Sequence, residues 1–303
     1  MSKYLDNNEL FLEPKTTQYG GHMVMTNVMK PMKKKYINID TRFRDEYNSG
    51  SLVNYNITLP ERITEVKSII ITNIEIPNSI YNISSSIGNN AFNIINTDSN
   101  AKKNVIIPDG NYNIAALISA IYDQLNSTFS GDIMISSTNN KCIFTSSTDK
   151  YTIDFTIDEN GNFDKYSPRS KLGWILGFRN MTYNIINGTP TASESFIDVN
   201  GSRYLYLAID EFSKGNQHSF ISPLPKSFIN KNILARITID GNTWGFGNII
   251  PSNIKSGNLV SDHRSYTGKT DLQKLNIQLL NEFGNPVDLN GMDFSFCIEV
   301  EHE

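Results

Sequence analysis

Apolar and polar residues alternate along much of the chain, and a period of two is typical of β-strands with one buried face. Two stretches, 272–280 and 292–301, show this most clearly, because their apolar side chains fall on every second position. Gly284 and Pro286 lie in the polar stretch between them and favour a turn. The pattern therefore predicts that residues 272–301 form a long β-hairpin that closes the chain.

Shorter stretches of the same kind predict the remaining strands, and Pro60 and Pro77 are expected to end two of them. Two polar stretches, 180–195 and 241–271, are predicted to be long surface loops. The predicted strands cover residues 36–39, 52–59, 66–76, 91–96, 104–107, 132–136, 141–146, 151–157, 203–210 and 233–240.

A helical period stands out once. Ile114, Leu117, Ile121 and Leu125 are spaced to share one face, and Asn113 precedes them as a suitable N-cap. The spacing predicts a connecting helix over 113–126 that packs on a sheet. A compact, partly apolar segment at 167–178 is compatible with a short helix and a turn.

Many strands, one clear helix and long loops predict an all-β fold, a single elaborated jelly-roll β-sandwich. The 303 residues are enough for one large β domain. We expect an N-terminal arm over 1–35 and a jelly-roll domain over 36–303. Residues 98–195 hold the helix and several hairpins, and they form either part of that domain or an insertion or second lobe.

Composition narrows the function. The net charge of −4 argues against a protein that binds nucleic acid by bulk charge. The two cysteines, Cys142 and Cys297, are expected to be reduced core residues. No apolar run approaches the roughly 20 residues of a membrane span. Residues 1–30 contain no apolar segment typical of a signal peptide, so we expect synthesis in a cytosol-like compartment.

Catalytic motifs are not found in the sequence. The four histidines are far apart, and the chain contains no HExxH, CxxC or GxSxG motif. The three glycines of 241–247 match neither a dinucleotide-binding nor a phosphate-binding loop. We therefore predict no catalytic, metal or cofactor-binding residues, no cofactor and no small-molecule substrate, and we expect that the protein is not an enzyme. A carbohydrate-active enzyme would need two carboxylates across a cleft, which a sequence alone cannot reveal.

Two groups of residues are candidates for binding. Lys30, Lys33, Lys34 and Lys35 form a basic cluster at the end of the expected arm. They are either a solvated patch or a contact to an acidic partner, and four lysines would bind nucleic acid only weakly.

Aromatic residues form the second group. Trp244, Phe246 and Tyr266 lie on the stretch 241–271, and Trp174 lies on the compact segment. They either anchor their loops in the core or stack on sugar rings at a surface site.

Several stretches together carry a resemblance. Their order along one chain is more specific than any single one, and they span residues 33–301. The chain resembles virion structural proteins of nucleocytoplasmic large DNA viruses, closest in kind to the minor capsid and penton-type proteins of mimivirus and phycodnavirus relatives. The stretches are KKKYINIDTRFRDEY, LPERITEVKSIIITNIEIPNSIYNIS, IPDGNYNIAALISAIYDQLN, SKLGWILGF and LNIQLLNEFGNPVDLNGMDFSFCIEVE.

The resemblance implies a jelly-roll capsid protein located in the virion and made in the host cytoplasm. Because 303 residues suit one roll rather than two in tandem, it implies a penton that forms a homopentamer at the fivefold vertices. Its expected partners are copies of itself, neighbouring major capsid protein capsomers and other minor capsid proteins. Another minor capsid protein of the same fold is a close alternative. A glycan-binding surface or spike module of the virion, using the 241–271 stretch, is the alternative of a different class.

Overall fold

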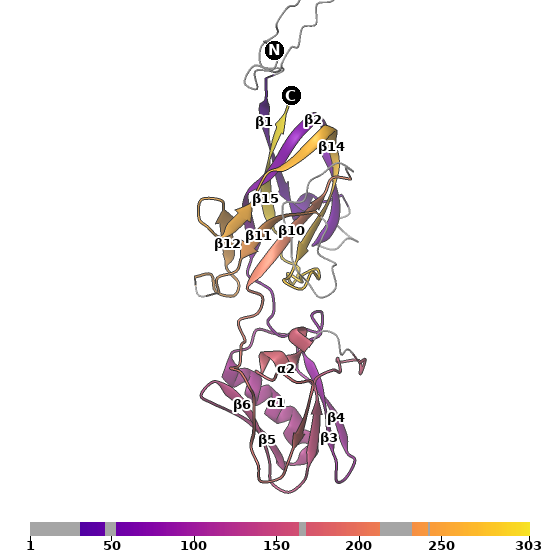
Figure 1. The fold of residues 1–303 in the computed structure, drawn as a ribbon, viewed down its shortest axis with the longest axis vertical. Coiled ribbons are helices and arrows are strands. Elements are labelled where there is room, and N and C mark those ends of the chain that lie inside the picture. The colour runs from indigo at the N-terminus through magenta and orange to yellow at the C-terminus, as the bar shows by residue number, and fades with distance from the viewer. Residues whose placement is uncertain (1–30, 46–52, 164–167, 213–231, 242) are drawn as a thin grey trace, which may run out of the picture.

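The computed structural model describes residues 31–45, 53–163, 168–212, 232–241 and 243–303. In these residues every strand pairing is antiparallel, and the sheets curl (Figure 1). The predicted all-β fold of the jelly-roll type is confirmed. The strands are β1 (Lys33–Asp40), β2 (Asn54–Pro77), β3 (Ala91–Asn96), β4 (Lys102–Ile106), β5 (Ile133–Thr138), β6 (Lys141–Ser146), β7 (Tyr151–Asp154), β8 (Thr182–Ile185), β9 (Thr191–Ala192), β10 (Tyr204–Asp210), β11 (Ile233–Thr238), β12 (Ile249–Asn253), β13 (Leu259–Ser261), β14 (Arg264–Leu280) and β15 (Ser295–His302). The helices are α1 (Ile114–Phe129) and α2 (Leu172–Ile175), with single 3-10 turns at Thr41–Phe43 (η2) and Pro168–Ser170 (η3).

The largest sheet has the order β1-β15-β2-β14-β10-β11-β13, and β12 also pairs with β2. The strand β2 is 24 residues long and belongs to both halves of the curl, because its first part pairs with β14 and its second part with β15 and β12. Ser261 brings the far end of the sheet back to β2. Its hydroxyl accepts from the Ile71 amide at 3.1 Å and donates to the Leu234 carbonyl at 3.0 Å.

The large sheet encloses a large hydrophobic core, and we call this part of the molecule, the described residues of 31–77 and 204–303, the proximal lobe. The alternation in β15 turns Phe296, Ile298 and Val300 inward, each at most 1% exposed. Residues 69–71 of β2 are buried on both faces, as expected of a central strand. Full burial of one such side chain stabilises the fold by about 1.5–3 kcal/mol. The inward-facing apolar side chains therefore stabilise the proximal lobe.

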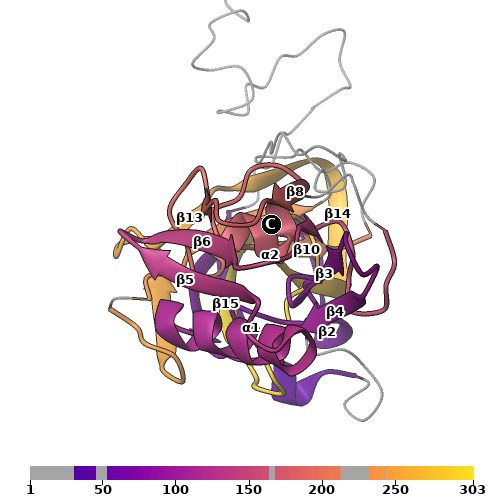
Figure 2. The same cartoon turned by 90° about the horizontal axis from the view of Figure 1, so that it is seen from below.

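A second core lies in residues 83–197, which we call the distal lobe (Figure 2). Its sheets are β4-β3-β7-β8 and β5-β6-β9, and α1 packs beside β4 and β5. As predicted, Asn113 caps α1: its side chain accepts from the Ala116 amide at 2.8 Å. The helix continues past residue 126 to Phe129, whose ring packs edge-on against Tyr151. The distal core extends beyond the predicted 98–195 segment, and its status as a separate domain stays a prediction.

The predicted closing hairpin is wrong. Both strands exist, but β2 lies between β14 and β15, so the two are not paired with each other. Residues 281–294 therefore cross over β2 instead of forming a hairpin turn. Alternation shows which face of a strand is buried, whereas the identity of its neighbour depends on contacts with distant segments.

Three further predictions need correction. β2 does not stop at Pro60 but continues through an irregular stretch without regular pairing between Thr58 and Ile63. A proline is tolerated there because no ladder hydrogen bond is required of it. The predicted loops at 180–195 and 241–271 contain the short strands β8, β9, β12 and β13 and the beginning of β14. Polar residues dominate these stretches, so the alternation is hard to recognise in them.

Candidate functional site

The two lobes meet at a waist formed by residues 78–82 and 198–203 (Figure 1). A cleft of about 520 Å³ lies at this waist, and we call it the waist cleft. The distal lobe contributes η3 and α2 to its lining, and the proximal lobe contributes the segment that follows β14. A binding partner in this cleft would contact both lobes.

The floor of the cleft is fixed by Asn82, which is 6% exposed. Its amide donates to the carbonyls of Tyr112 at 2.7 Å and Val199 at 2.6 Å, and its oxygen accepts from the Tyr112 amide at 2.9 Å. Asn89 donates in turn to the Asn82 carbonyl at 2.8 Å. Because these bonds connect both crossing segments, the polar floor is held in place before anything binds.

One wall of the cleft is both basic and aromatic. The guanidinium of Arg179 lies 4.0 Å from the centre of the Trp174 ring, and that of Arg169 lies 6.0 Å from it. Arg179 also donates through Nη1 to the carbonyls of Trp174 and Phe178. Within the residues that the structure describes, neither arginine forms an ion pair, and the guanidinium of Arg169 makes no hydrogen bond. This wall can therefore accept an anionic group.

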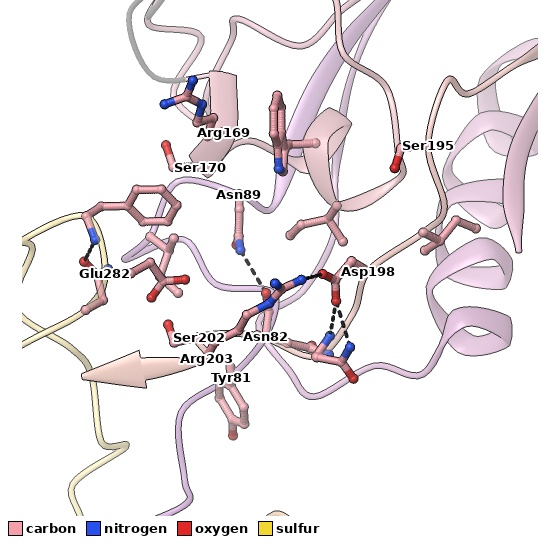
Figure 3. A pocket seen from close by; sticks show the side chains of 18 of the residues that line it. Tyr81, Asn82, Asn89, Arg169, Ser170, Ser195, Asp198, Ser202, Arg203 and Glu282 are labelled. Atoms are coloured by element: carbon pink, nitrogen blue, oxygen red, sulfur yellow. Dashed lines mark hydrogen bonds and ion pairs between the residues drawn. The ribbon is translucent and has the colours of Figure 1, made fainter. Parts of the chain in front are cut away.

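A third arginine is already paired. Arg203, just before β10, reaches Asp198 with an Nη2–Oδ2 distance of 2.7 Å (Figure 3). Burial raises the pKa of the Asp198 carboxyl, but hydrogen bonds from Arg203 and Asn200 outweigh it, so the pKa lies below its ordinary value. Asp198 stays ionised at neutral pH, and the pair neutralises itself.

The proximal lobe places a carboxylate in the same cleft. The Oε2 atom of Glu282 is buried and has no hydrogen-bond partner within the described part of the chain. Phe283, beside it, is 37% exposed, and Phe196 from the distal lobe is 62% exposed. The waist cleft thus combines two unpaired guanidinium groups, one unpartnered carboxylate oxygen and exposed aromatic rings. Such a set favours binding over chemistry, because aromatic residues and arginine are enriched in protein interfaces.

The predicted lysine cluster is divided. Lys30 lies outside the described residues, and Lys33, Lys34 and Lys35 belong to β1 instead of the expected arm. Lys34 pairs with Glu299 at 2.5 Å, and Lys35 pairs with Glu61 at 2.7 Å. These two lysines therefore have acidic partners within their own chain, and a contact between the cluster and another molecule stays a prediction.

The predicted aromatic residues are also separated. Tyr266 lies in β14 and is 7% exposed, so it is a core residue and not on a surface loop. Phe246 is 47% exposed and stacks on Tyr81 with ring centres 5.7 Å apart, whereas Trp244 is half-buried. Glycan binding by Trp244 and Phe246 stays a prediction.

A serine, a histidine and a glutamate meet where β2 and β15 pair. The Ser68 hydroxyl donates to Glu301 at 2.8 Å and lies 3.2 Å from His263 Nδ1. In a catalytic triad the histidine takes the serine proton, whereas here that proton points to the carboxylate. We interpret this trio as a link between strands. In the described residues no group of three or more His, Cys, Asp or Glu side chains could hold a metal ion, and no helix is long and apolar enough to cross a membrane.

The chain is similar to the mavirus penton protein. The crystal structure of that protein aligns with a TM-score of 0.44 and 9% sequence identity, over 90% of this chain and 100% of the mavirus chain. A chain of the Sputnik virophage structure, determined by cryo-EM at 3.5 Å, aligns with a TM-score of 0.38 and 12% identity, over 90% of this chain and 98% of its own. No protein-family model matches the chain, and no curated protein sequence matches it.

Of the residues that line the waist cleft, Trp174 was a sequence candidate for binding, but the charged residues were not predicted. Arg169, Arg179, Arg203 and Glu282 come from segments far apart in the sequence, and only the fold brings them together. One signal was available: two arginines flank Trp174 at a distance of five residues on each side. That spacing suggests cation–π contacts but does not show that a cleft exists.

Proposed function

We propose that the chain is a structural protein of a viral capsid, and in particular a penton whose copies close a homopentameric ring at the fivefold vertices. Its work is assembly and not catalysis. Its partners are further copies of itself, the surrounding capsomers of the major capsid protein and other minor capsid proteins. It is made in the host cytoplasm and resides in the virion.

The observation that carries the proposal is where the capsid-like sequence stretches fall in the fold. Three of them supply β1, β2, β14 and β15, which are consecutive neighbours in the large sheet in the order β1-β15-β2-β14. The other two supply α1 and α2 of the distal lobe. The resemblance thus covers the framework of both lobes and is not confined to one local motif.

The surface of the proximal lobe offers apolar material for an interface. The strand β12, the turn after it and β13 each expose one aliphatic side chain: Ile249 by 48%, Ile254 by 44% and Val260 by 50%. Large exposed apolar patches are typical of association surfaces, and we propose that these three side chains contribute to one. They support contact between copies without showing how many copies meet.

The test is the absolute mass in solution, measured by light scattering on a size-exclusion column. We expect a species of five times the 34.2 kDa chain. The double substitution Ile249→Glu and Val260→Glu should dissociate it, because two carboxylates would be buried in the interface. Met134→Glu in β5, at a side chain that is 44% exposed, is the control and should leave the mass unchanged. A strict monomer at high concentration contradicts the capsid-ring function, and a stable trimer contradicts the penton.

A further inference from the structure

We propose that the waist cleft binds the acidic, apolar segment Leu5–Glu13 of a neighbouring copy of this chain. The inference rests on the proposed function, because it requires that copies lie side by side. It gives the N-terminal segment a binding site, the waist cleft, which the sequence alone does not indicate.

The cleft defines what its partner must carry. Arg169 and Arg179 lack a carboxylate partner within the described residues, so the partner must supply one or more acidic groups on that side. Glu282 Oε2 is buried without a donor, so the partner must also supply a hydrogen-bond donor or a cation on the other side. The exposed rings of Phe196 and Phe283 require apolar side chains between the two.

One segment of the chain meets all three requirements. Residues 5–13, LDNNELFLE, contain three carboxylates and four large apolar side chains within nine positions. Lys3 and Lys15 flank the segment and can supply the cation for Glu282. Charge complementarity of this kind selects a partner and fixes its register. A volume of about 520 Å³ admits a short part of the segment, in the size range of ligand pockets.

The residues between the acidic segment and β1 are long enough to extend beyond their own molecule. The described chain enters β1 at the end of the proximal lobe that lies away from the waist (Figure 1). The 17 residues from Pro14 to Lys30 can extend over about 55–60 Å. A reach of this length allows contact with a copy that lies alongside, and the mixed-isotope products described below distinguish that copy from the same molecule.

The experiment uses the full chain with a photoreactive benzoylphenylalanine in place of Phe196. Illumination is followed by trypsin, which releases residues 4–15 as one peptide because Lys3 and Lys15 bound it. We expect this peptide to be cross-linked to residues 180–203, the tryptic peptide that holds position 196. Mixing ¹⁴N- and ¹⁵N-labelled protein before illumination should give mixed-isotope products. The same photoreactive residue at Met134 is the control and should not capture the peptide.

Charge substitutions show whether the cross-link depends on specific charge pairing between the cleft and the segment or only on their being close together. Arg169→Glu should lower the yield of covalently cross-linked dimer, measured on a denaturing gel before trypsin is added, several-fold. Glu9→Lys should do the same, and combining the two should restore part of the yield. Both positions carry flexible charged side chains, and Arg169 is exposed, so folding can be verified by circular dichroism. Absence of the 4–15 cross-link, products of one isotope only, or a yield that Arg169→Glu does not change would overturn the inference. The mass of the same sample distinguishes the failures: a pentamer without the cross-link refutes only the cleft contact, whereas a monomer also refutes the ring.

Discussion

At the scale of single residues, Gly177 shows why a short motif is more than a pattern. Its φ of +92° is a conformation that side chains other than glycine rarely adopt, and an added Cβ would lie 2.2 Å from the Ser195 carbonyl oxygen. The Ser195 amide also donates to the Gly177 carbonyl at 2.9 Å. This glycine allows the end of the SKLGWILGF stretch to pass directly against the segment that lines the waist cleft.

We therefore predict that Gly177→Ala lowers the free energy of unfolding by more than about 2 kcal/mol, because a steric clash adds to a backbone strain of about 1–2 kcal/mol. Gly188→Ala is the matched control, since its φ is +69° but nothing lies within 4 Å of its added Cβ. It should lose only the strain. Urea denaturation measures both, and equal losses would show that the close approach is unimportant.

Residue patterns predicted some side chains well and others not. Asn113 was predicted as a cap because its partner, the amide of Ala116, is three residues away. Tyr266 was misplaced because its surroundings come from segments that lie far away in the sequence. The charged residues of the waist cleft could not be predicted for the same reason, since they come together only where the two lobes meet.

At the scale of elements, β1 is held to the sheet partly by charge. Glu299 of β15 accepts from Lys34 at 2.5 Å and from the Tyr36 hydroxyl at 2.9 Å. The hydrogen bond from Lys34 is the main cause that lowers the pKa of Glu299, and the bond from Lys35 likewise lowers the pKa of Glu61. A carboxyl group whose pKa is lower in the folded state stabilises it above the unfolded pKa, about 4.3 for glutamate.

The attachment of β1 should therefore be complete at neutral pH and weaken as the pH falls below about 4.3, through the lowered pKa values. Glu299→Gln should reduce the hydrogen-exchange protection of the β1 amides a few-fold at pH 7 and flatten its acid dependence, after correction for intrinsic rates. Glu75→Gln is the control, because Glu75 accepts from Ser295 and, in the part of the chain that the structure describes, forms no hydrogen bond or ion pair with β1. If both variants lose the same protection, the charges on Glu299 do not hold the strand.

The elements themselves were largely predictable, and their neighbours were not. Alternation located β15, which has one buried face, whereas β10 and β11 contain runs of consecutive buried residues and were recognised by their apolar content. The insertion of β2 between β14 and β15 was not predictable, since strands far apart in sequence pair through tertiary contacts. Short strands such as β9, with two residues, give too few positions for any period.

At the scale of the whole molecule, two large hydrophobic cores stand out among the described residues. The proximal core is built mainly from aliphatic side chains of the large sheet, whereas the distal core contains a cluster of rings that includes Phe92, Phe144, Phe155 and Phe178. The sequence suggested residues 98–195 as an insertion or second lobe, but the distal core begins at Ile83 and ends at Ile197. The predicted segment left out β3 and the loop before it. In sequence, β3 does not differ from the strands of the proximal lobe.

Because the cores are separate, we predict that the lobes unfold in two steps, as independently folding domains do. Differential scanning calorimetry should show two unfolding transitions. Phe144→Ala should lower the midpoint temperature of only one of them, and Ile298→Ala that of only the other. Each substitution empties a fully packed position and should cost about 2–5 kcal/mol in its own lobe. Hydrogen exchange assigns the steps, since α1 should lose protection with the first variant and β15 with the second. A single transition that both variants lower equally would mean that the waist couples the lobes into one cooperative unit, because the hydrogen bonds of Asn82 then transmit unfolding from one core to the other.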